Sequence, residues 1–260
     1  MADPVLYSVA DGVATVRLNR PSAHNALDEA TGRALLAAMA RAAEDARVRV
    51  VVLAADGPTF SAGGDFNWVL GWPQLSVAEQ HAGATLLSNA VQAIYDLPKP
   101  SIARVQGATV GGGIGMMLAC DYAVAADDTR FGLTSVRNGL LAGIAIPELI
   151  QALGARRARQ VLLHGGVMPA ERALALGLVD IVVPAADLDA EVARLAGELK
   201  LGAPTVQTLI KRLVTEFAAS PRDRAAAARI ADEVAGQCTT ADAREGMSAF
   251  LQKRKAAWTK

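Results

Sequence analysis

A glycine-rich stretch in the middle of the chain constrains the fold more than any other feature of the sequence. The apolar residues 101–105 lead into Gly107, three consecutive glycines at 111–113 and Gly115, and a helix-like apolar run covers 114–119. This order predicts a buried strand, a tight turn and a helix start. Glycine lets backbone N–H groups approach a ligand, and a helix N-terminus favours negative charge. Such a turn can hold a phosphate or a developing oxyanion, and it can equally be a packing turn.

Two common nucleotide-binding motifs do not fit this stretch. The pattern G-x-G-x-x-G requires a glycine at the position that Met116 occupies, and no Lys-Ser or Lys-Thr pair follows the glycines as a Walker loop requires. The glycines therefore indicate a ligand other than a pyrophosphate bound in either of those ways.

The bulk composition limits the partners and the compartment. Lys plus Arg and Asp plus Glu number 26 each, which argues against nucleic-acid binding through a basic surface. The N-terminus lacks a basic and an apolar segment, and the longest apolar run, 107–120, is shorter than the roughly 20 residues of a membrane span. Cys120 and Cys238 do not make a disulfide framework, and His24 and His164 lie at no metal-ligand spacing. We expect a soluble, cytoplasmic protein that binds no nucleic acid, no membrane and no metal.

Periodicity predicts an α/β core in the first part of the chain. Asp28 is the expected N-cap of a helix whose apolar side holds Leu35, Ala38, Met39 and Ala42. A long helix over 76–97 is expected to cover other elements. The expected strands are a hairpin of 5–9 with 13–18 turning at 10–12, and single strands over 48–54, 101–105, 122–126 and 130–132.

Helical spacing dominates the sequence from Ile146 onward. Only 177–184 returns to a strand pattern, and the expected helices cover 187–200, 204–218, 222–236 and 241–257. We therefore predict an α/β core over residues 1–195 and a C-terminal helical region over 196–260.

A second glycine loop of the same kind follows the buried strand at 48–54. It reads Phe60-Ser61-Ala62-Gly63-Gly64-Asp65, and two such loops can supply one N–H donor each to a single oxyanion. With this loop the sequence resembles the enoyl-CoA hydratase/isomerase (crotonase) family over essentially its whole length. The blocks that carry the resemblance, in the family's order and spacing, are 19–21 with 25–27, 60–65, 107–121, 173–180 and 244–255.

The resemblance implies a spiral of ββα units, a C-terminal helical trimerisation region, and a homotrimer or a dimer of trimers. It implies a coenzyme A thioester as substrate, with no permanently bound cofactor. Gly64 and Gly112 match the two positions whose backbone N–H groups bind the thioester oxygen. The other matched positions are expected to bind the coenzyme. Ala23, Ala62 and Asp65 are expected to do so within one chain, although the position of Asp65 is usually structural in the family, and Phe250 and Lys253 reach the coenzyme of a neighbouring subunit.

The chain departs from the hydratase pattern at both catalytic glutamates. By the resemblance these would stand at Gly115 and Ser135. General acid–base catalysis contributes about 10²–10⁴-fold per group, and serine does not accept a proton from water at neutral pH. Three hypotheses follow: another group acts as the acid or base, the reaction is a decarboxylation or C–C cleavage that needs less proton transfer, or the protein binds acyl-CoA without turnover.

Five side chains are candidate replacements for the missing glutamates, and each also has an ordinary structural explanation. Asp65 can be structural, Glu79 and His81 can lie on a solvated helix face, Arg137 can pack in its loop, and Glu148 can be a favourable first-turn charge. Trp68 and Trp72 lie in the segment 67–97 that covers the expected site, and they can line the acyl pocket or pack beneath it.

Overall fold

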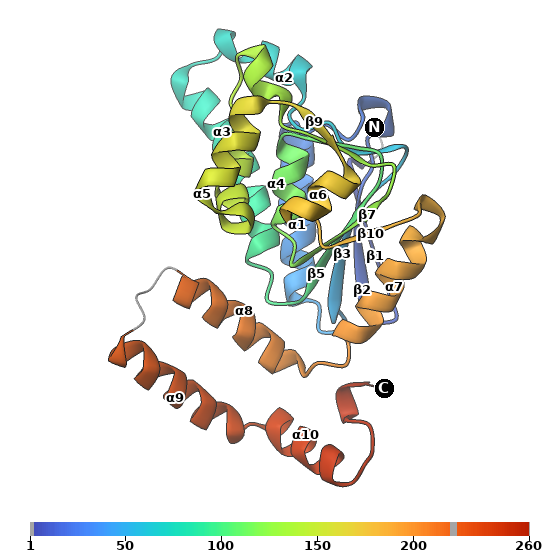
Figure 1. The fold of residues 1–260 in the computed structure, drawn as a ribbon, viewed down its shortest axis with the longest axis vertical. Helices are drawn as coiled ribbons and strands as arrows, with labels where there is room; N and C mark the ends of the chain where they lie inside the picture. The colour runs from blue at the N-terminus through green and yellow to red at the C-terminus, as the bar shows by residue number, and fades with distance from the viewer. Residues whose placement is uncertain (1–2, 219–222, 260) are drawn as a thin grey trace.

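The computed structural model describes residues 3–218 and 223–259 as an α/β structure with two sheets and a C-terminal helical region (Figure 1). The order of strands in the larger sheet is β1-β2-β3-β5-β7-β10, and in the smaller sheet β4-β6-β8-β9. Their bounds are β1 Val5–Ala10, β2 Val13–Leu18, β3 Val50–Ala55, β4 Thr59–Ser61, β5 Ser101–Val105, β6 Ala108–Val110, β7 Tyr122–Ala126, β8 Arg130–Gly132, β9 Val167–Pro169 and β10 Ile181–Val183.

The predicted N-terminal hairpin is confirmed. β1 and β2 are antiparallel, with Ala10 opposite Val13, so Asp11 and Gly12 form a two-residue turn. Their φ values of 48° and 75° are those that a type I′ turn needs. The other neighbouring strands of the larger sheet pair in parallel.

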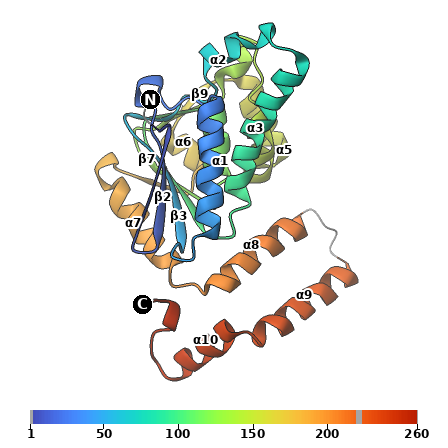
Figure 2. The same ribbon diagram turned by 180° about the vertical axis from the view of Figure 1, so that it is seen from behind.

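The helices cover both faces of the larger sheet. Asp28 caps α1 by accepting a hydrogen bond from the Thr31 N–H, and Ser76 and Glu79 form a capping box on α3. Figure 2 shows α7 on the opposite side of the sheet from α1. The bounds are α1 Glu29–Glu44, α2 Phe66–Leu70, α3 Val77–Tyr95, α4 Gly112–Leu118, α5 Ile146–His164 (interrupted at Gly154), α6 Ala170–Leu176 and α7 Leu188–Leu199.

Alternate residues of each strand build separate cores on the two faces. Val51 and Leu53 of β3 pack in the core that includes α1, α3 and α4, whereas Val50, Val52 and Ala54 pack against α7. β3 is buried over its whole length, as the continuous apolar run predicts.

The C-terminal helices form an arm at one end of the molecule (Figures 1 and 2). They are α8 Pro204–Ala218, α9 Arg224–Cys238 and α10 Ala241–Leu251. No residue of the described helices α8 and α9 is buried. After α10 the described chain turns back toward Leu201 and Arg49: the Trp258 indole donates to the Leu201 carbonyl, and Arg49 donates to the Trp258 carbonyl. Helix α7 packs on the sheet and runs across the predicted boundary at 195/196 to Leu199. The division into 1–195 and 196–260 stays a prediction.

Two predictions for the second half of the chain are wrong. The strand β9 was missed, because it is three residues long, ends in Pro169 and lies at the edge of the smaller sheet, antiparallel to β8. The helix expected over 241–257 ends at Leu251, and Lys253 has a left-handed φ of 53°. The first residue expected in the helix 222–236 lies outside the described residues.

No helix in the described part of the chain combines the length and apolarity needed to cross a membrane.

Candidate functional site

The first glycine loop leaves a backbone donor unused at Gly64. Leu27 donates to the Gly63 carbonyl (2.7 Å) and accepts from the Asp65 N–H (2.9 Å), in a parallel bridge with Gly64. In this pattern the N–H of Gly64 itself points away from Leu27. Gly64 is exposed, and its N–H has no acceptor among the described residues.

The second glycine loop leaves a donor unused at Gly112. Gly112 is the first residue of α4, so its N–H is one of the groups that a helix start leaves without an intrahelical partner. Gly111 before it has φ 50° and ψ −113°, a conformation suited to glycine, and it donates to the Gly132 carbonyl (2.9 Å). The described residues supply no acceptor to the Gly112 N–H.

The two loops touch at Gly63. A Cβ atom on Gly63 would lie 2.7 Å from the Val110 carbonyl oxygen and 3.2 Å from the Gly112 nitrogen, and its φ is 85°. Only glycine allows this approach without a shift of the backbone. Two unpaired N–H groups therefore stand in adjoining loops, an arrangement that can stabilise an oxyanion.

Arg20 and Asn25 hold the segment that precedes α1 against the first glycine loop. Arg20 donates to the Ala26 carbonyl (2.6 Å) and forms ion pairs with Asp28 and Asp65 at 3.0 Å each. The buried Asn25 amide donates to the Asp56 and Thr59 carbonyls. Both residues belong to the sequence block 19–21 with 25–27, whose spacing alone predicts no role for them.

Two of the residues expected to meet the coenzyme lie side by side. The Ala62 N–H donates to the His24 carbonyl (2.9 Å), which puts the turn that contains Ala23 next to Ala62. Asp65 is engaged in structural contacts: besides its ion pair with Arg20, its carboxylate caps α2 by accepting from the Asn67 N–H (3.0 Å).

A short segment before α5 fills the space beside α4. A Cβ on Gly115 would lie 2.9 Å from the Ile144 carbonyl oxygen and 3.2 Å from the Ala145 Cα, so the backbone there leaves no room for a side chain. Ser135 is half-buried, and its Oγ lies 3.5 Å from the position of a Cβ on Gly111. Nothing in the sequence signalled the contact with Ile144.

Comparisons with known proteins decide the family. The sequence profile of the enoyl-CoA hydratase/isomerase family matches residues 8–260. The chain belongs to the enoyl-CoA hydratase/isomerase family. It is 31% identical to the crotonyl-CoA hydratase of Syntrophomonas wolfei, with 97% of this chain and 96% of that protein covered. The crystal structure of an enoyl-CoA hydratase from Mycobacterium smegmatis superposes with a TM-score of 0.91 at 33% identity, covering 99% of each chain.

One of the relatives is named for a reaction other than hydration. A 4-chlorobenzoyl coenzyme A dehalogenase of Arthrobacter is 33% identical over 211 residues, covering 79% of this chain and 75% of that protein. The crotonase fold and an acyl-CoA enzyme follow from these similarities, whereas the reaction of this chain does not.

Three of the candidate replacements for the family glutamates make local contacts on the surface. Glu79 serves the capping box of α3, and the hydrogen bond from Ser76 lowers the pKa of its carboxyl. His81 contacts Thr85 (3.4 Å) on the exposed side of the same helix. Arg137 is exposed and donates to the His164 carbonyl (3.3 Å).

Glu148 is the fourth candidate, and it lies at the other end of α4 from Gly112. Its Oε2 is buried and makes no hydrogen bond with the described residues, and burial raises the pKa of its carboxyl. It lines a cavity of about 320 Å³ together with Leu118, Ala119 and Lys211. Glu148 therefore faces the junction between α4 and α8.

Trp68 and Trp72 pack as a pair against α3. Their rings are T-shaped at 5.1 Å, and both come within 3.3 Å of the position of a Cβ on Gly83 in α3. A cavity of about 240 Å³ lies between the two tryptophan rings and Arg33 of α1.

Phe250 and Lys253 lie far from the glycine loops within one chain. The Phe250 side chain is 83% exposed at the end of α10, and Figure 1 shows α10 at the opposite end of the molecule from α2, which follows Gly64 directly. Their expected contact with the coenzyme of a neighbouring subunit stays a prediction.

We expect the substitution Gly63→Ala to separate the two glycine loops and Gly64→Ala to leave them in place. At Gly63 the methyl group meets the Val110 carbonyl and a left-handed φ, which costs at least about 1–2 kcal/mol. At Gly64 nothing lies within 4 Å of the added Cβ. Thermal unfolding and coenzyme A thioester affinity measured on both variants test this, and equal losses in the two would contradict it.

We expect Glu148→Gln to stabilise the fold increasingly as the pH rises. Below about pH 4 the carboxyl is neutral in the folded and the unfolded chain, so it costs nothing. As the pH rises toward its raised folded pKa, the unfolded chain ionises first and the wild type loses stability. Partial solvent access weakens the effect. Melting temperatures of both proteins at pH 4 and pH 8 measure it, and a difference that does not change with pH is the contrary result.

Proposed function

We propose that this protein binds a coenzyme A thioester and stabilises the enolate of its acyl group through the N–H groups of Gly64 and Gly112. The observation that carries the proposal is the contact of the two loops at Gly63, which brings two unpaired donors together. A thioester enolate carries its negative charge on one oxygen, and each preorganised donor is worth roughly 3 kcal/mol in the transition state. On this reading Ala23 and Ala62 contact the coenzyme.

We further propose a reaction in which the substrate supplies the enolate, namely decarboxylation or C–C cleavage of an acyl-CoA. Two positions favour this reaction over hydration. Gly115 has no room for a side chain, and Ser135 carries only a hydroxyl, so neither residue can activate water as a glutamate would. In an acyl-CoA with a carboxylate on the α-carbon, the C–C bond breaks, CO2 leaves, and the electron pair becomes the enolate. A water proton then completes the product.

We expect slow or absent hydration of crotonyl-CoA. A typical enzyme turns over about 10 times per second, and each missing acid–base group costs about 10²–10⁴-fold. The loss of the conjugated thioester absorbance at neutral pH measures hydration, and methylmalonyl-CoA measures decarboxylation by release of CO2. Turnover of crotonyl-CoA near the typical rate would overturn the proposed reaction. Binding of both thioesters without turnover of either would leave an acyl-CoA-binding subunit.

The variant Gly64→Pro tests the donor itself. Proline removes the N–H, whereas Gly64→Ala keeps it, so the proline variant should lose about 10²–10³-fold in turnover that the alanine variant retains. Melting temperatures show whether both variants are folded. Equal activity of two folded variants would exclude a role for the Gly64 donor.

We propose that the C-terminal arm joins copies of the chain into a homotrimer or a dimer of trimers. Apolar side chains stay uncovered along the described arm, among them Ile230 and Val234, one turn apart on α9. The double substitution Ile230→Asp and Val234→Asp should lower the mass measured by light scattering. Val77→Asp, 81% exposed on α3, is the matched control and should leave the mass unchanged. A wild-type protein that is monomeric at micromolar concentration would contradict the assembly.

A further inference from the structure

Two adjacent residues in the turn that precedes α1 have a left-handed backbone, and buried contacts explain only one of them. His24 and Asn25 have φ values of 50° and 52°, which disfavour residues other than glycine. Asn25 is buried, and its amide donates to the Asp56 and Thr59 carbonyls. His24 is exposed, and its ring makes one contact within the described residues, from Nδ1 to Thr59 Oγ1 at 3.2 Å. Backbone strain of this kind gathers at ligand-binding positions, so His24 is a candidate contact for a ligand.

The turn places His24 beside the proposed path of the coenzyme. Its carbonyl accepts from the Ala62 N–H (2.9 Å), and Ala23 precedes it in the chain. Its ring lies toward Thr59, which starts β4 upstream of Ala62, whereas Gly64 lies downstream. A coenzyme whose thioester lies at Gly64 therefore passes Ala62 and Ala23 before it reaches the ring. In coenzyme A the pantetheine arm comes first along such a path, and the phosphates follow it.

The contact with Thr59 leaves the outer edge of the His24 ring as a donor. Thr59 is 7% exposed, so Nδ1 faces β4, and the opposite edge of the exposed ring, with Nε2, faces solvent. When the Thr59 hydroxyl donates to Nδ1, the ring proton is on Nε2, and in the charged ring both nitrogens carry a proton. In both of these forms the Nε2–H group can donate to a ligand. A charged phosphate oxygen is a stronger acceptor for it than an amide oxygen of the pantetheine arm.

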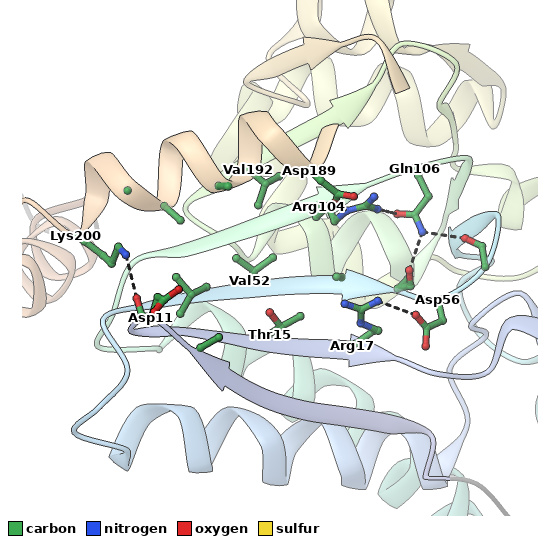
Figure 3. A pocket seen from close by; sticks show the side chains of 18 residues that line it. Asp11, Thr15, Arg17, Val52, Asp56, Arg104, Gln106, Asp189, Val192 and Lys200 are labelled. Atoms are coloured by element: carbon green, nitrogen blue, oxygen red, sulfur yellow. Dashed lines mark hydrogen bonds and ion pairs between the residues drawn. The ribbon is translucent and has the colours of Figure 1, made fainter. Parts of the chain in front are cut away.

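The carboxylates around this turn are engaged by cations. Asp56 lies next to the turn and forms an ion pair with Arg17 at 3.0 Å (Figure 3). Asp28 and Asp65 both form ion pairs with Arg20 at 3.0 Å. An opposite charge at this distance weakens the repulsion between a carboxylate and an anion nearby. The surroundings therefore permit a phosphate at the ring.

We propose that the Nε2–H group of His24 binds a phosphate of the coenzyme and thereby selects coenzyme A thioesters over thioesters of pantetheine alone. This inference rests on the proposed function, because the thioester has to lie at Gly64 for its coenzyme to reach the turn. The left-handed backbone holds the ring at the edge of the loop, and the conformation is kept for binding although it lowers the stability of the fold.

The first test measures the affinity for coenzyme A by titration calorimetry in the wild type and in two variants. His24→Asn removes the ring and introduces a residue that tolerates a left-handed backbone, so it should weaken binding about tenfold, the effect of one hydrogen bond to a charged group. His81→Asn is the matched control, because it removes the same ring from the exposed side of α3. This variant should bind coenzyme A as the wild type does.

The second test identifies the phosphate with truncated ligands. Dephospho-coenzyme A lacks the 3′-phosphate, and pantetheine lacks every phosphate. The difference between the wild type and His24→Asn should vanish with dephospho-coenzyme A if the ring binds the 3′-phosphate. It should persist there and vanish only with pantetheine if the ring binds the pyrophosphate.

The third test separates binding from a structural role. His24→Gly removes the strain and the ring together, so its melting temperature should be no lower than that of the wild type, while its affinity for coenzyme A falls as in His24→Asn. A ring that is kept only for its contact with Thr59 would give the opposite result, a lower melting temperature and an unchanged affinity.

Three results would overturn the proposal. These are an unchanged affinity of His24→Asn for coenzyme A, a loss of the same size for pantetheine as for coenzyme A, and an equal loss in His81→Asn. A wild-type protein that binds no coenzyme A would contradict the proposed function as well. Binding of coenzyme A that does not depend on His24 would leave the proposed thioester site standing.

Discussion

The close contact between Gly63 and the backbone of residues 110–112 is the constraint on which the candidate site depends. The two loops come from different ββα units and follow strands of the smaller sheet, β4 and β6, which pair in parallel. Their backbones approach so closely that a single methyl group at Gly63 would collide with the Val110 carbonyl. Because the approach uses backbone atoms, the two donors are held by the fold itself and need no side chain for their orientation.

Partly buried polar contacts from an earlier segment hold the first of these loops. Arg20 joins Asp28 and Asp65 at its guanidinium group, and Asn25 donates to the carbonyl groups of Asp56 and Thr59 at the start of β4. Paired polar contacts of this kind rigidify the segments that they join. The segment before α1 thereby sets the position of Gly64, through Leu27 and its bridge to the loop.

The packing around α4 supports the proposal that this chain does not activate water with two glutamates. The Ile144 carbonyl stands against Gly115, so the absence of a side chain there is part of the packing. Ser135 offers a hydroxyl close to the second glycine loop, and Glu148, the buried carboxyl with a raised pKa, faces α8 instead. One relative is named as a 4-chlorobenzoyl coenzyme A dehalogenase, which agrees with a fold that supports different reactions on coenzyme A thioesters.

Local patterns in the sequence determined the hairpin at Asp11 and Gly12, the cap at Asp28, the buried strand β3 and the family, because each depends on neighbours along the chain or on motif spacing. They failed at β9, whose three residues are strand only because β8 pairs with them, and at the end of α10, where the chain turns back toward Leu201. The meeting of the two glycine loops and the closing of Gly115 by Ile144 each join residues that are distant in sequence. Only the tertiary structure decided them, because no local pattern encodes the distance between two backbones that approach each other through packing.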